Sequence, residues 1–162
     1  MSSFLGRSDL PRGLRNNNLG NIRVAKNDWL GKIPVLKNTD GSFEQFKDVP
    51  HGIRAMFKLL IGYFENKGIK TIRGIINKYA PPFENNTEAY IQSVAKKTGI
   101  PADKELKFLN KKTLIEIGKA IVLIENFGGQ FKKYAPLVKV ENYETAFNLL
   151  GADEKKKLTT EL

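Results

Sequence analysis

The chain has 162 residues, of which 41% are hydrophobic, and its formal net charge is +10. This length and composition predict one globular domain over residues 1–162 and argue against wholesale disorder. The sequence holds no cysteine and one histidine, His51, so disulfides and thiolate sites are excluded and a histidine-based metal site or Ser-His-Asp triad is disfavoured. We therefore expect no metal and no cofactor, and any catalysis would rest on carboxylates.

The excess of basic residues indicates an acidic polymer as partner: nucleic acid, an anionic membrane surface or an anionic cell wall. The lysines are spread along the chain rather than gathered in one block, so charge alone does not choose among these partners. No uncharged apolar run approaches the roughly 18 residues of a membrane span. The first residues lack the apolar core of a signal peptide.

Four asparagines stand close together near the N-terminus, beside two glycines and among several arginines: Asn16, Asn17, Asn18 and Asn21. An asparagine amide carries both donors and an acceptor, which suits it to binding the hydroxyl and acetamido groups of a sugar. Asparagine and glycine are also the usual residues of tight turns. Both interpretations, a sugar-binding loop and an ordinary turn, stay open at this point.

A single carboxylate, Glu44, stands between Phe43 and Phe46. Apolar aromatic surroundings make a carboxyl group a candidate general acid. The same alternation of apolar and polar residues is typical of a half-buried strand, in which Glu44 would have no chemical role.

Two short strands are predicted at residues 29–36 and 42–46, joined by a turn through Asp40 and Gly41. Pro34 cannot donate a ladder hydrogen bond and places its strand at an edge. Trp29, the only tryptophan, is either a core or lid residue of this β-hairpin or a platform on which a sugar ring stacks.

From Pro50 onward the apolar residues recur at helical spacing. The longest such segment, about residues 50–67, is predicted to be a central buried helix that ends at Gly68. Residues 102–108 are expected to hold one or two helical turns, and the charged residues from Gly151 on are expected to fray. We predict a mainly α fold (α+β), a helical bundle around that central helix with a small N-terminal β-hairpin. Further helices are predicted at residues 71–79, 87–98, 112–126 and 138–150.

Two further features have a structural and a functional interpretation. Arg54, near the start of the central helix, is either an exposed charge or a side chain that reaches back to Glu44. The polar loop that contains Glu84 and Asn85 either caps the following helix through Asn86 or Thr87, or it faces the asparagine cluster across a cleft.

The segment RNNNLGNI, from Arg15 to Ile22, resembles the opening motif of a family of small phage and prophage virion proteins, except that Leu19 stands where the family has proline. The resemblance covers roughly residues 12–127, the family-like core, and leaves residues 128–162 as a C-terminal helix and tail outside it. The further matching segments are Trp29–Gly31, Phe43–Phe46, Gly52–Met56, Thr71–Ile72, Tyr79–Pro81, Glu84–Thr87, Tyr90–Ile91 and Glu125–Asn126.

The layout of this family is similar to that of lysozyme-like enzymes, and the resemblance implies that Glu44 is the general acid that protonates the glycosidic oxygen. A hydrolase pairs such an acid with a second carboxylate, for which Glu84 is a better candidate than Asp40, a turn residue, or Asp48, a helix cap. A lytic transglycosylase can act with one acid/base. The sugar would contact Asn16, Asn17, Asn18, Asn21, Trp29, Arg54, Asn85 and Tyr90.

The sequence therefore predicts a peptidoglycan-cleaving glycosidase of lysozyme or lytic-transglycosylase type. It would be associated with a phage particle or a contractile injection machine, act in the periplasm or cell wall, contact phage tail or virion proteins, and bind nucleic acid weakly and nonspecifically. The alternative is a non-enzymatic virion or tail protein that binds wall glycan or DNA. A sequence-specific DNA-binding protein ranks last, because no helix-turn-helix with basic residues at the start of its second helix is recognisable.

Overall fold

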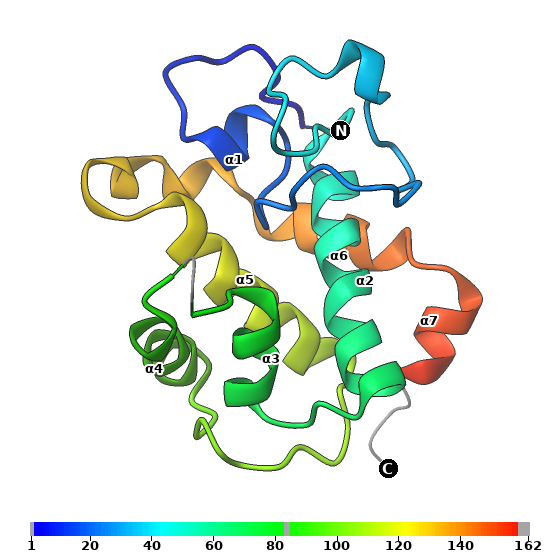
Figure 1. The fold of residues 1–162 in the computed structure, drawn as a ribbon, viewed down its shortest axis with the longest axis vertical. Coiled ribbons are helices and arrows are strands. Elements are labelled where there is room, and N and C mark those ends of the chain that lie inside the picture. The colour runs from blue at the N-terminus through cyan, green and yellow to red at the C-terminus, as the bar shows by residue number, and fades with distance from the viewer. Residues whose placement is uncertain (1, 83–84, 159–162) are drawn as a thin grey trace. The chain divides into compact units, whose positions relative to one another are not determined.

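The computed structural model describes residues 2–82 and 85–158 and shows a mainly α protein (Figure 1). The described residues group into two compact units. The first is made of Met1–Phe57 and Glu125–Leu150, and the second of Lys58–Ile124 and Gly151–Leu162.

The first unit joins irregular N-terminal segments to four helical elements: the short helix α1 (Arg12–Arg15), the 3₁₀ turn η1 (Val35–Lys37), the 3₁₀ segment η2 (Gly129–Leu137) and α6 (Val140–Asn148). The first turns of the long helix α2 (Val49–Lys67) also belong to it. In Figure 1 the blue N-terminal segments gather around these turns. The apolar side chains that are wholly buried here are Leu14, Leu19, Phe46, Val49, Ile53, Ala55, Met56, Phe57 and Ala146.

The predicted β-hairpin is not found among the described residues, where strand pairing is limited to two isolated antiparallel bridges, Arg23 with Phe43 and Lys32 with Phe46. The chain after Pro34 turns into η1 instead of extending as a strand, and Pro34 has no backbone N–H to pair. The segment 42–47 therefore finds backbone partners in residues 22–24 and 31–33 rather than in one opposite strand.

The second unit contains the rest of α2 together with α3 (Ile72–Tyr79), α4 (Thr87–Thr98), most of α5 (Lys111–Asn126) and α7 (Ala152–Lys157). Helices α3 and α4 lie against each other (Figure 1). The hydroxyl of Thr71 caps α3 by accepting the Gly74 N–H at 3.0 Å, and the Asn86 side chain caps α4 by accepting the Ala89 N–H at 3.3 Å. Gly99, with φ at +73°, ends α4.

The periodicity located the main helices to within about two residues. The predicted central helix at 50–67 is confirmed as Val49–Lys67, and the helix predicted at 112–126 is found as Lys111–Asn126. The helical turns expected at 102–108 do not form. That segment instead bonds to the chain around the start of α3, where the Arg73 N–H donates to Ala102 and the Leu106 N–H donates to Lys70.

No helix in the described part of the chain is both long enough and apolar enough to cross a membrane. Among the same residues, no group of three or more His, Asp or Glu side chains is arranged to hold a metal ion.

Candidate functional site

Asn17 and Asn18 form the centre of a buried polar network, and neither side chain is exposed. The Asn17 amide donates to the Phe46 carbonyl and to the Ser3 hydroxyl, both at 2.9 Å, and its oxygen accepts the Phe4 N–H at 2.8 Å. Asn17 has a left-handed backbone, with φ at +55°, which asparagine tolerates better than most residues. The amide therefore ties the N-terminal segment to the segment that carries Glu44.

Asn18 performs a similar function for the neighbouring turn. Its amide donates to the carbonyls of Ile22, at 2.9 Å, and Glu44, at 3.0 Å, and its oxygen accepts the Ile22 N–H at 2.9 Å. Both N–H groups of Asn17 and of Asn18 are thus used within the protein. These two side chains build the scaffold, and they hold the backbone of Glu44 in place.

Asn21, at φ +51°, also has left-handed backbone, and its amide donates to Glu125 at 2.8 Å. Its oxygen is buried with no hydrogen-bond partner. Gly13 lies close to this oxygen. A Cβ added at Gly13 would stand only 2.7 Å from it and would also collide with the side-chain oxygen of Asn126. A glycine is therefore needed where the asparagine cluster meets the end of α5.

Asn16 lies in a different environment, at the wall of a polar pocket of about 310 Å³. Its amide donates to Asp40 at 2.9 Å, and its oxygen accepts from Gln45 at 2.9 Å. The Arg12 guanidinium binds Asp40 in a bidentate manner at 2.7 and 2.8 Å. These contacts, the Arg12 hydrogen bond foremost, hold the pKa of Asp40 well below its usual range. Asp40 is therefore a firmly ionised carboxylate.

Glu44 is completely buried. One of its oxygens, Oε2, accepts the Ala25 N–H at 3.3 Å and forms an ion pair with Lys32 at 3.0 Å, while the other, Oε1, has no hydrogen-bond partner. The Lys32 ammonium also donates to the carbonyls of Ala25 and Asn27, at 3.2 and 3.0 Å. The sequence suggested purely aromatic surroundings for Glu44 and gave no sign of Lys32, since nothing in the spacing of the two residues indicates their contact.

Three other predicted residues lie in the first unit or at its edge. Trp29 is half-buried, and its indole N–H has no partner. Arg54 is buried and donates from Nε to the Leu149 carbonyl at 3.1 Å, so it contacts the C-terminal end of α6. Asp48 accepts the His51 N–H at 3.0 Å, which confirms it as a cap at the start of α2.

The remaining predicted residues belong to the second unit. Asn85 is exposed and donates to the Pro81 carbonyl at 3.3 Å, and Tyr90 is buried in α4. Glu84 lies outside the described residues. The roles predicted for these three residues therefore stay predictions.

A comparison with known proteins identifies a phage relative. Protein P5 of Pseudoalteromonas phage PM2 is 40% identical to this chain over 122 residues, which is 74% of the chain and 73% of that protein. The chain belongs to the family of phage protein P5. No family model matches the sequence. The expected kinship with phage proteins is thus confirmed at the level of a phage protein family.

For this member of the P5 family, the first unit offers two kinds of polar chemistry. One is a buried carboxyl group, that of Glu44, with one oxygen that has no hydrogen-bond partner. The other is the pocket beside Asn16, in which arginine, carboxylate and amide groups are fixed by one another. Sequence reasoning missed the pocket, because its lining residues come from four separate segments between Gly6 and Gln45 that no spacing rule brings together.

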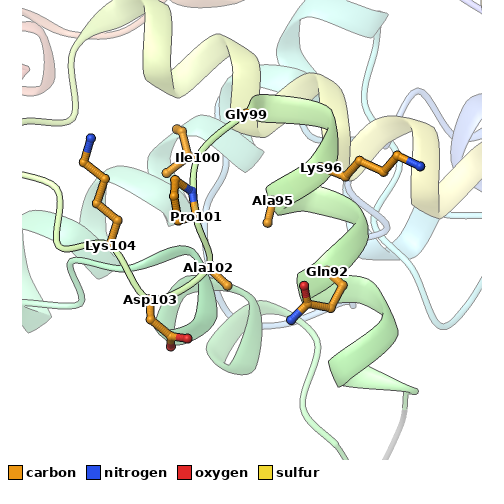
Figure 2. Close-up of a pocket in the computed structure, with 9 residues that line it drawn as sticks. All are labelled: Gln92, Ala95, Lys96, Gly99, Ile100, Pro101, Ala102, Asp103 and Lys104. Atoms are coloured by element: carbon orange, nitrogen blue, oxygen red, sulfur yellow. The ribbon is translucent and has the colours of Figure 1, made fainter.

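A larger hollow of about 790 Å³ lies in the second unit, between the last turns of α4 and the turn from Gly99 to Lys104 (Figure 2). Figure 2 shows Gln92, Ala95 and Lys96 on its helical side. Its one carboxylate, Asp103, already pairs with Arg73 at 2.7 Å. This hollow has no second acid and no buried polar side chain among its lining residues, so it is the weaker candidate for chemistry.

Proposed function

We propose that this P5-family protein is a peptidoglycan-cleaving glycosidase of lysozyme or lytic-transglycosylase type, with a lysozyme-like arrangement of its acid and long helix. It would be carried by a phage particle or a contractile injection machine and act on the cell wall. The observation that carries the proposal is Glu44, a wholly buried carboxyl whose Oε1 lacks a hydrogen bond. A polar atom left unsatisfied in a core costs stability, and a catalytic role is one reason for which a protein keeps such an atom.

In this proposal Glu44 acts in an opened form in which Lys32 no longer pairs with it, and the protonated carboxyl donates its proton to the glycosidic oxygen as the bond to the sugar's anomeric carbon breaks. Access to Glu44 requires that residues 25–32 move away, because both groups bound to Oε2 belong to Ala25 and Lys32. Most of this segment is exposed, and between Ala25 and Gly31 its backbone N–H groups make few bonds. A segment with few backbone hydrogen bonds opens at a lower free-energy cost than one in which all of them are formed.

Cleavage with Glu44 as the acid can follow one of two routes, transglycosylation or hydrolysis. In a lytic transglycosylase, the 6-hydroxyl of the muramic acid attacks its own anomeric carbon and returns a proton to Glu44, which closes a 1,6-anhydro ring. In a hydrolase, a second carboxylate activates water. Trp29, Arg54 and Asn21, whose side-chain oxygen has no hydrogen-bond partner, are proposed to contact the sugar, and the +10 charge suits an anionic wall.

The test is clearing of purified peptidoglycan by the wild type and by Glu44→Gln, which keeps the shape of the side chain and removes the acid. Glu65→Gln serves as the matched control, since Glu65 is exposed on α2 and loses the same charge. We expect Glu44→Gln to abolish clearing while its circular dichroism spectrum stays native and Glu65→Gln clears at the wild-type rate. A folded Glu44→Gln variant with wild-type clearing would exclude Glu44 as the acid.

A second candidate function, a non-enzymatic phage component that binds glycan or DNA, is favoured by one observation. The N–H groups of Asn17 and Asn18 are all used internally, and Glu44 is ion-paired, as in a purely structural core. Such a protein would sediment with the wall without clearing it. If DNA were its ligand, affinity would fall steeply with salt, because phosphate contacts release counterions. A wall enzyme would bind DNA only weakly.

A further inference from the structure

The polar pocket beside Asn16 has a floor that is fixed before any ligand arrives. Asn16 and Gln45 are 2% and 6% exposed. Gln45 donates to both Asn16, at 2.9 Å, and the Thr39 hydroxyl, at 2.8 Å, while its oxygen accepts the Thr39 N–H at 2.9 Å. Every polar atom of the Gln45 side chain therefore has a hydrogen-bond partner within the protein. Because these side chains are already fixed, ligand binding loses no conformational entropy in ordering them.

The charges around this pocket do not cancel. Asp40 is matched by Arg12, and it also accepts the backbone N–H groups of Ser42 and Phe43 at 3.1 and 3.0 Å. Arg15, which lines the same pocket from the end of α1, donates from Nη1 to the Leu10 carbonyl at 3.2 Å and forms no ion pair within the described part of the chain. The pocket lining therefore carries one net positive charge, that of Arg15.

From this arrangement we infer that the pocket binds a carboxylate-bearing sugar, with Arg15 as the residue that binds the carboxylate. A guanidinium has five N–H donors in a planar fork that matches the two oxygens of a carboxylate. The hydroxyls of Ser8 and Thr39, also in the lining, can donate to and accept from sugar hydroxyls. The volume of about 310 Å³ is at the small end of ligand pockets and suits one sugar ring.

The inference rests on the proposed function for the identity of the sugar. Among the sugars of the wall glycan, N-acetylmuramic acid carries a carboxyl on its lactyl ether, whereas N-acetylglucosamine carries none. This carboxyl is a free carboxylate where the stem peptide has been removed, and an amide where the peptide is attached. The pocket would therefore hold a peptide-free muramic acid unit and set the register of such glycan on the protein.

The experiment measures binding of the disaccharide N-acetylglucosaminyl-N-acetylmuramic acid by calorimetry, beside its methyl ester, in which the carboxylate is neutralised. The protein is the full chain carrying Glu44→Gln, so that binding is read without cleavage. The acid is expected to bind about 10- to 100-fold more tightly than the ester, the range of a charge-assisted hydrogen-bonded pair. Arg15→Gln should remove that preference, and Arg7→Gln, which neutralises an exposed arginine outside the pocket lining, should keep it.

Comparing the two ligands needs no Arg15 variant, so the inference stays testable even if Arg15→Gln fails to fold. Equal affinity for acid and ester, or no binding of either, overturns it, as does an unchanged preference in folded Arg15→Gln. If the wild type clears no peptidoglycan but the Arg15-dependent preference is found, the pocket stands and the enzymatic proposal fails. If clearing depends on Glu44 and the preference is missing, the reverse holds.

Discussion

Replacing Gly52 by alanine should destabilise the protein, although alanine is normally the better helix residue. Gly52 lies in the first turns of α2, where a Cβ would collide with the Asn17 carbonyl oxygen, would stand 2.9 Å from the carbon of that carbonyl and would stand 3.3 Å from the Asn18 Cα. These are backbone atoms, and the hydrogen bonds of the Asn17 amide to Phe46 and Ser3 keep them from shifting.

The expected cost follows from this geometry. Cβ atoms in proteins essentially never approach other atoms within 3.0 Å, so either the asparagine turn or the helix must move. Overpacking of this kind costs about 3 kcal/mol, against a gain of up to about 1 kcal/mol in helix propensity. For a chain of this size, a net loss of about 2 kcal/mol lowers the melting temperature by roughly 4–8 °C.

The assay is thermal unfolding followed by circular dichroism at 222 nm, with Gly62→Ala as the matched control. Gly62 lies in the same helix, and its added Cβ would meet only the Asn66 side chain at 3.9 Å, so this variant should be as stable as the wild type or more stable. Equal melting temperatures for Gly52→Ala and Gly62→Ala would refute the packing of α2 on the asparagine turn.

Four further changes test other parts of the account. Asn18→Ala should cost about 3 kcal/mol in denaturant unfolding, because it removes three hydrogen bonds and leaves the Ile22 N–H and the Glu44 carbonyl unpaired. Lys32→Met should cost about 3–5 kcal/mol by stranding the Glu44 charge. Thr71→Ala should cost about 1 kcal/mol through loss of the α3 cap. Asp40→Asn should cost about 2 kcal/mol at neutral pH, and its deficit should shrink below about pH 4.

The sign of the Asp40 effect follows from its lowered folded pKa. Its contribution to stability is complete above the unfolded pKa, about 4, and is lost as the pH falls toward the folded value. A deficit of Asp40→Asn that stays constant down to pH 2 would contradict the Arg12 ion pair. A loss below 1 kcal/mol for Lys32→Met would contradict the ion pair between Lys32 and Glu44. Unchanged unfolding of Asn18→Ala or Thr71→Ala would contradict the corresponding hydrogen bonds.

The helices could be predicted from the sequence because each buries one face. Apolar residues such as Ile53 and Ile117 therefore occur at a spacing set by helix geometry. The N-terminal segments have no such period. Their conformation is set by side-chain to backbone hydrogen bonds between residues far apart in sequence, such as Asn17 to Phe46. The prediction of a β-hairpin was wrong there. The turn through Asp40 and Gly41 was expected to join two paired strands, but the segment 42–47 bonds to residues 22–24 and 31–33 instead.

The candidate site was predictable in part. The asparagine cluster and Glu44 stood out in the sequence by residue type, and the structure shows Asn16, Asn17, Asn18 and Glu44 to be buried, which is uncommon for polar residues. Which amides are used internally and which face a pocket depends on contacts that no local pattern encodes. Asn16 and Asn17 are adjacent, yet only Asn16 lines the pocket, and the Lys32 partner of Glu44 could not be inferred from spacing.

The most direct test of Glu44 as the catalytic acid is the release of soluble fragments from purified peptidoglycan, measured by mass spectrometry, for the wild type and Glu44→Gln. Muropeptides are expected from the wild type alone. Reducing ends among them would identify hydrolysis, and 1,6-anhydro ends would identify transglycosylation. Release of the same fragments by folded Glu44→Gln, or no release by either protein while both bind the wall, would contradict the assignment of Glu44 as a catalytic acid.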